Sequence, residues 1–186
     1  MKKRMYLTAV LLIFLWAIPA SPSKEVKTTE KHYTASTVWV SSIAELAGIE
    51  NIYTIAPANL KHPPEYEITP NDMVQLMKSD LIFHAGYEKM VKVMTASAEI
   101  PEEKLVKVKT TNTLENLTAM IIKLSGIADT RETAEKNQKK LDKLFAEARK
   151  TVIEKKLNEI PAFVNINQAE FAKDIGLNVV ATFGPG

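Results

Sequence analysis

The chain contains no cysteine and has only 6 glycines among its 186 residues. Without thiols it has no cysteine nucleophile, no disulfide framework and no cysteine near its start that could accept a lipid anchor. A Gly-rich phosphate loop and a Gly-x-Ser-x-Gly elbow are also missing from the sequence. We therefore expect a protein that is not an enzyme and that depends on a packed core for its stability.

The sequence also lacks an excess of charge of either sign. Lysine and arginine number 24, aspartate and glutamate number 22, and the formal net charge is +2. This balance gives no electrostatic reason to expect a nucleic-acid partner. Apolar residues make up 46% of the chain, which is normal for a globular protein. We expect the protein to be a monomer.

The amino end has the pattern of a secretory signal peptide. A basic start, Met1–Arg4, precedes an apolar run over residues 6–18 and small residues over 19–23. The run is shorter than the ~20 apolar residues that a membrane-spanning helix needs. We predict a signal peptide over 1–20 and a disordered start of the mature chain over 21–36. Together with the missing lipoprotein cysteine, this predicts a soluble periplasmic protein.

Strands and helices are expected to alternate through the middle of the chain. We predict strands at 37–40, 51–55, 81–83 and 105–108, and helices at 43–47, from Pro70, at 87–94, and from Thr113 to a stop at Gly126. The third strand is apolar without alternation, which is typical of a strand buried on both faces of a parallel sheet. The pattern predicts an α/β class with a doubly wound N-terminal lobe over 37–129.

A long charged helix and a short α/β unit are predicted to follow. The helix should run from Thr130 to about Leu157, within a backbone segment 130–160, with a narrow apolar stripe: Ala134, Leu141, Phe145, Ala148 and Val152. Strand, helix and strand are predicted at 162–164, 168–174 and 179–181. We interpret 161–186 as the start of an incomplete second α/β lobe, because such a small sheet leaves edges and an apolar face uncovered. We therefore expect a fragment or a truncated reading frame.

His62 is the leading candidate for a metal ligand. It lies in a proline-stiffened loop over 56–68, after the second predicted strand and ahead of a helix start marked by Thr69, Pro70 and Asp72. Ligands in doubly wound sheets bind beyond the carboxyl ends of the strands, where this loop belongs. Neutral imidazole is a good ligand for zinc and manganese. The alternative is a solvated loop histidine.

Two segments resemble the metal-binding substrate receptors of bacterial ABC importers for zinc and manganese. Residues 61–72 are similar to the family pattern His-x-Tyr-Glu-x-(Ser/Thr)-Pro-x-Asp, and residues 79–86 to Ala-Asp-Leu-(hydrophobic)₃-x-Gly. The order of lobe, long helix and second lobe is also similar. The resemblance implies a periplasmic receptor that holds Zn²⁺ or Mn²⁺ between its lobes as transported ligand, not as a catalytic cofactor. It also implies a membrane permease of an ABC importer as partner.

The sequence departs from the family pattern at every ligand position. His62 stands two residues further upstream than the commonest spacing, and no histidine follows the fourth strand. Counting back from Gly176 puts Asn165 at the family's third histidine, and Gln168 or Glu170 would serve if the local alignment shifts. The fourth ligand would lie beyond Gly186. An amide oxygen is a weak ligand for zinc, so the resemblance implies at most one standard ligand here.

The remaining polar candidates have structural interpretations beside the functional ones. Glu67 could add a metal-binding oxygen, hydrogen-bond to His62 or shape the loop, whereas Glu65 reads as a solvated loop residue. His84 is expected to be packed or hydrogen-bonded near the end of the third strand. Asp72 is expected to cap its helix, and His32 to do nothing specific.

Two other functions fit the same residues. One is an extracytoplasmic binding protein for a different ligand, such as a metal chelate, with His62 incidental. The other is an adhesion or scaffold protein that reuses the receptor fold. The missing second and third histidines favour the first of these alternatives.

Overall fold

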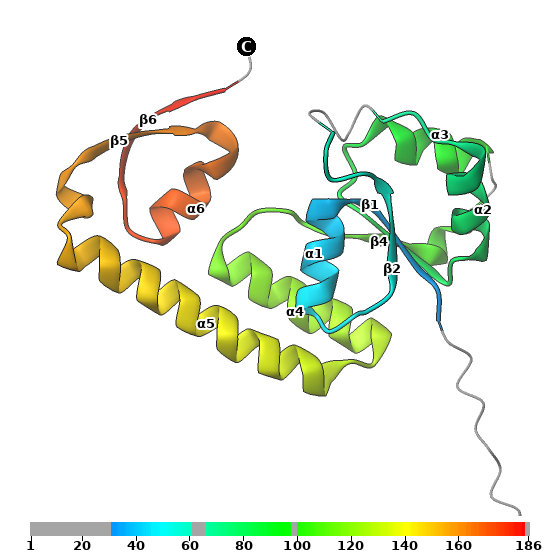
Figure 1. Ribbon diagram of the computed structural model, residues 1–186, viewed down its shortest axis with the longest axis horizontal. Helices are drawn as coiled ribbons and strands as arrows, with labels where there is room; N and C mark the ends of the chain where they lie inside the picture. Colours follow the sequence, from blue (N-terminus) through cyan, green and yellow to red (C-terminus); the bar gives the residue numbers. More distant parts are fainter. Residues whose placement is uncertain (1–30, 61–65, 98–99, 185–186) are drawn as a thin grey trace, which may run out of the picture. The chain divides into compact units, whose positions relative to one another are not determined.

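The structure, a computed structural model, describes residues 31–60, 66–97 and 100–184. Its first part is built on a parallel four-stranded sheet with the strand order β2-β1-β3-β4 (Figure 1). The strands are β1 (Tyr33–Thr37), β2 (Ile52–Ala56), β3 (Leu81–His84) and β4 (Leu105–Lys107). The predicted signal peptide, 1–20, lies outside the described residues.

Helices cover both faces of this sheet. Helices α1 (Val38–Leu46) and α4 (Leu114–Ala128) pack on one face, with α5 (Arg131–Glu154) against them, and α2 (Pro70–Lys78) and α3 (Lys89–Ser97) pack on the other (Figure 1). Phe83 packs into the core on the face covered by α1 and α4, and Ile82 packs into the core on the face covered by α2 and α3. Both residues are fully buried. Adjacent residues of β3 thus point into opposite cores, as a central parallel strand requires. The predicted doubly wound α/β lobe is confirmed.

The first strand begins earlier than predicted. Residues 33–36, expected to be disordered, form β1, where Ala35 is fully buried and pairs with Thr54 on one side and Phe83 on the other. Residues 38–40, expected to be strand, open α1 instead, and Val40 is buried on its inner face. The β-branched and aromatic composition of this stretch was misleading, because tertiary contacts override strand propensity.

Helix α2 begins as the sequence predicts. Thr69 is the N-cap, Pro70 occupies the first turn, and Thr69 and Asp72 form a reciprocal capping box. Leu76 is buried, whereas Met77 is 68% exposed. Only two side chains of the helix, Asp72 and Leu76, are buried, so its contact with the core is narrow.

The two long helices meet at a tight corner. Helix α4 does not stop at Gly126 but continues to Ala128, where Asp129 adopts a left-handed conformation with φ 61°. Helix α5 then runs for 24 residues and ends at Glu154, earlier than predicted. It buries four residues of the predicted stripe, Ala134, Leu141, Phe145 and Val152, whereas Ala148 is half-buried. Among the described ranges, no helix is both long enough and apolar enough to cross a lipid bilayer.

A small α/β unit follows α5. Strands β5 (Pro161–Asn165) and β6 (Asn178–Phe183) form a two-stranded parallel sheet, joined through α6 (Ala169–Asp174). Short 3-10 turns lie at η2 (Glu102–Lys104), η3 (Leu157–Glu159) and η4 (Ile166–Gln168). The predicted strand–helix–strand order is confirmed.

Asp174, at the end of α6, fastens this unit to the two long helices. Its carboxylate accepts a bond from Arg149 Nη2 of α5 at 2.6 Å and another from the Leu114 backbone N–H of α4 at 2.6 Å. Beside it, the rings of Phe145 and Phe171 meet edge to face with centroids 5.9 Å apart. These contacts join the end of α6 to the start of α4 and to α5.

Candidate ligand-binding cleft

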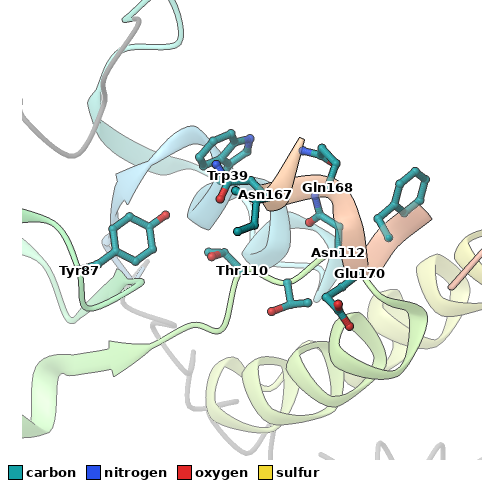
Figure 2. Close-up of a pocket in the computed structure, with 10 residues that line it drawn as sticks. Trp39, Tyr87, Thr110, Asn112, Asn167, Gln168 and Glu170 are labelled. Atoms are coloured by element: carbon teal, nitrogen blue, oxygen red, sulfur yellow. The ribbon is translucent and has the colours of Figure 1, made fainter. Parts of the chain in front are cut away.

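A cavity of about 500 Å³ opens where several strands end, and we call it the cleft. Its walls come from the start of α1, the turn after β3, the loop after β4, and the turn between β5 and α6 (Figure 2). The described residues that line it are Trp39, Tyr87, Thr110, Thr111, Asn112, Ile166, Asn167, Gln168, Glu170 and Phe171. Its position is the one at which parallel α/β sheets bind ligands.

The wall that carries Tyr87 is held by a buried carboxylate. Glu88 is fully buried, and its carboxylate accepts hydrogen bonds from Ser36 Oγ at 2.5 Å, Ala85 N–H at 2.8 Å and Gly86 N–H at 2.7 Å. Burial by itself raises the pKa of Glu88, but these hydrogen bonds outweigh burial and the net pKa is lowered. The ionised Glu88 thus ties the end of β1 to the turn after β3.

The wall after β4 is held by an amide. Asn116, buried in the first turn of α4, donates from Nδ2 to the carbonyl oxygens of Lys109 at 2.9 Å and Thr111 at 2.7 Å. Thr113 caps α4 by accepting a bond from the Asn116 N–H at 3.3 Å. These bonds fix the backbone that presents Thr110, Thr111 and Asn112 to the cleft.

The loop between β2 and α2 is anchored at its end by Asp72. This carboxylate is buried and accepts bonds from Tyr53 Oη at 2.7 Å, Tyr66 Oη at 3.1 Å, Thr69 N–H at 2.7 Å and Thr69 Oγ1 at 2.7 Å. Burial raises the pKa of Asp72, but these donors more than compensate and the net pKa is lowered. The same bonds raise the pKa of Tyr53, because a phenol that donates to a carboxylate resists ionisation.

The predicted metal ligands are not brought together among the described residues. His62, the leading candidate, and Glu65 lie outside them. Glu67 is exposed and does not appear among the residues that line the cleft. Asn165 uses its Oδ1 to accept a bond from the Asn167 N–H at 2.9 Å, which caps η4. Within residues 31–60, 66–97 and 100–184, no three His, Asp or Glu side chains form a group that could hold a metal ion.

The two alternatives offered for Asn165 do lie in the cleft. Gln168 and Glu170 both line it, and both are exposed. Glu170 Oε1 accepts a bond from Lys173 Nζ at 3.1 Å on the surface of α6. The described lining of the cleft therefore offers one carboxylate, which is already paired with an ammonium group.

His84 is half-buried at the end of β3, and it does not line the cleft. Burial lowers the pKa of His84, the neighbouring Glu88 opposes this, and Lys107 and Lys123 lower it further. Within the described part of the chain, its buried Nδ1 has no hydrogen-bond partner. A neutral, packed imidazole fits this environment. His32 precedes β1, and its backbone N–H donates to Asp80 Oδ2 at 2.8 Å.

Sequence reasoning missed most of the cleft. The sequence analysis placed Trp39 in a strand and Tyr87 in a helix. It noted of the segment after the fourth strand, which includes 110–112, only that it contains no histidine. The signal that could have found them is positional, because each of these residues follows the carboxyl end of a strand.

The comparisons with known proteins identify the fold. No protein-family model matches the chain, and a search of curated proteins gives no match. Among solved structures, a Mn-bound periplasmic metal binding protein from candidatus Liberibacter asiaticus matches with TM-score 0.60 and 16% identity, over 83% of this chain and 68% of that chain. The Cd-bound form matches with TM-score 0.59, 16% identity and the same coverages.

A zinc-bound ZnuA with residues 138–173 deleted matches with TM-score 0.60 and 14% identity, over 84% of this chain and 72% of that chain. The chain thus has the fold of periplasmic metal-binding proteins. At these identities the likeness establishes the fold alone.

Proposed function

We propose that this chain is a periplasmic solute-binding protein that captures a divalent transition metal, Zn²⁺ or Mn²⁺, and delivers it to the permease of an ABC importer. The observation that carries the proposal is the shared fold, since solved structures of this fold include metal-bound periplasmic proteins. In this role the metal is cargo, the chain is not an enzyme, and the receptor acts as a monomer.

The proposed metal site is centred on His62. The loop that contains this histidine starts at the carboxyl end of β2, and its far end is anchored by Asp72. Among the described residues, the carboxylate nearest to His62 in sequence is that of Glu67, which is exposed and not packed in the core. Asn165 has its amide oxygen engaged as a cap, so any contribution to the metal would require that bond to break.

Weak metal binding follows from this donor set. Tight zinc sites use three or four His, Cys, Asp or Glu ligands, and an amide oxygen is a poor substitute for imidazole. Loss of a ligand should cost more than the ~10–100-fold that loss of an outer hydrogen-bond partner costs. We therefore expect an affinity for zinc well below that of a site with three or four such ligands.

Calorimetric titration of zinc and manganese into the full chain tests the proposal. Measurable binding that disappears in His62→Ala and survives in His32→Ala would support it. His32 is a matched control because it is exposed and precedes β1, at the opposite end of the strands from the cleft. Equal affinity in all three proteins, or no binding of either metal, would overturn the metal assignment.

A further inference from the structure

Two aromatic side chains in the cleft are unusually open. Trp39 is 55% exposed and Tyr87 is 50% exposed, and both face the same cavity from different strand ends (Figure 2). Large aromatic side chains contribute strongly to binding when they are covered, because each presents a rigid apolar surface with one polar group. Such surfaces suit the flat C–H face of a ring-shaped organic ligand.

The polar groups of the cleft have unused hydrogen-bonding capacity. Within the described part of the chain, the amide side chains of Asn112, Asn167 and Gln168 make no hydrogen bond, although all three line the cavity. An amide offers both donors and an acceptor, and the hydroxyls of Thr110 and Thr111 do the same. Ligand hydroxyl groups, which also donate and accept, are the natural complement of this mixture.

The charges of the described lining residues favour an uncharged ligand. None of its described lining residues is Lys, Arg or His, so these residues offer no cation to an anion. The one carboxylate, Glu170, already has Lys173 as its partner at 3.1 Å, which reduces its attraction for a cation. The cavity of about 500 Å³ lies within the ~300–1,000 Å³ range of small-molecule sites.

We infer that the cleft binds a small, uncharged, hydroxyl-rich organic molecule of the size of one or two sugar rings, stacked on Trp39 and hydrogen-bonded by Asn112 and Gln168. This inference rests on the proposed role as a solute receptor, but it does not depend on a metal. It gives the cleft a ligand whose recognition uses the residues that line it.

Calorimetry on the full chain in the presence of EDTA tests the inference with matched sugars. Titrants are the neutral N-acetylglucosamine, glucose, maltose and cellobiose, with glucosamine and glucuronate as cationic and anionic counterparts. We expect at least one neutral sugar to bind with a dissociation constant below ~1 mM and at least about tenfold more tightly than both charged sugars. No binding by any neutral sugar at that concentration, or preference for a charged one, would overturn the inference.

Variants locate the site. Trp39→Ala and Gln168→Ala should each weaken binding of the preferred sugar by about tenfold or more, since stacking and a hydrogen bond are lost. Phe163→Ala is the matched control, because Phe163 is 71% exposed on β5 and does not line the cleft. Equal loss in Phe163→Ala, or no loss in Trp39→Ala with an unchanged thermal unfolding midpoint, would contradict the assignment.

The outcome is separable from that of the metal proposal. His62→Ala should leave sugar binding in EDTA unchanged, because EDTA removes the metal and the proposed sugar contacts come from Trp39, Asn112 and Gln168. A chain that binds zinc but no sugar would disprove this inference and leave the metal proposal standing. A chain that binds sugar but no metal would disprove the metal proposal and leave this inference standing.

Discussion

The sheet of the first lobe and the sheet formed by β5 and β6 are built alike but buried very differently. In the first, Ile82 and Phe83 of β3 are each fully buried, because helices cover both faces. In the second, Ala162 and Val164 are half-buried, whereas Phe163 between them is 71% exposed. A continuous run of apolar residues thus forms a strand buried on both faces in one place and a strand buried on one face in the other.

The difference teaches that the contribution of a strand to stability depends on whether helices cover one face of its sheet or both. Apolar burial contributes roughly 25 cal/mol per Å² of surface removed from water, so a residue covered on both sides of a sheet counts far more than one facing out. The cleft lies where the two sheets' strand ends come together, so a deeply buried framework and a more exposed unit each supply part of its wall.

Replacing one strand phenylalanine in each sheet by alanine should give the largest difference in the loss of unfolding free energy. Phe83→Ala should lower the free energy of unfolding by about 3–5 kcal/mol, since it leaves a cavity beneath α1 and α4. Phe163→Ala should change it by less than about 0.5 kcal/mol, because the ring is exposed. Urea denaturation followed by circular dichroism measures both, and similar losses would show that Phe163 is covered in solution.

Replacing the buried carboxylate of the first lobe should have the next largest effect. Glu88→Gln should cost about 2–3 kcal/mol, because the amide cannot accept all three hydrogen bonds from Ser36, Ala85 and Gly86. Ser36→Ala removes one donor only and should cost less.

The pH dependence of stability tests the same carboxylate. Its folded-state pKa is below the ordinary value of 4.5, so its contribution is fully present above about pH 4.5 and is lost as pH falls through the lower folded-state pKa. Glu88→Gln should therefore lose less stability than the unmodified chain in that acid range. Parallel curves of stability against pH for the two proteins would contradict the assignment.

Removing the cap of α2 should have a moderate effect. Asp72→Ala should cost about 1–2 kcal/mol, because it removes the acceptor for Tyr53, Tyr66 and the Thr69 N–H. Tyr53→Phe should cost less, and the two losses should be smaller in combination than their sum, because the variants share one bond. Strict additivity, measured by a double-mutant cycle in urea, would argue against that bond in solution.

Loosening the contact between α6 and the long helices should have the smallest effect on stability. Asp174→Asn weakens the ion pair with Arg149, whose side chain is 42% exposed, so the cost should be about 1 kcal/mol or less. We expect binding in the cleft to suffer more than stability, because Phe171 and Gln168 line the cleft and belong to the same small α/β unit as Asp174. Unchanged ligand affinity in Asp174→Asn would show that the cleft does not depend on it.

The sequence predicted the architecture better than the site. The apolar run Leu81–Phe83 and the cap formed by Thr69 and Asp72 were readable because they depend on local patterns. The start of α1 was misjudged because Val38, Trp39 and Val40 have strand propensity, and only pairing with β2 and β3 shows that the strand lies at Tyr33–Thr37. The cleft was not predictable in detail, since residues from four separate loops meet only after the sheet has formed.

Hydrogen–deuterium exchange with and without zinc, followed by mass spectrometry, tests the central claim of a metal-binding receptor most directly. The account predicts that zinc slows exchange in the peptides that cover residues 57–69, the loop at the carboxyl end of β2. Exchange in the peptides of α5 should not change. In His62→Ala the same peptides should show no difference. Slower exchange elsewhere, or none in residues 57–69 of the unmodified chain, would contradict it.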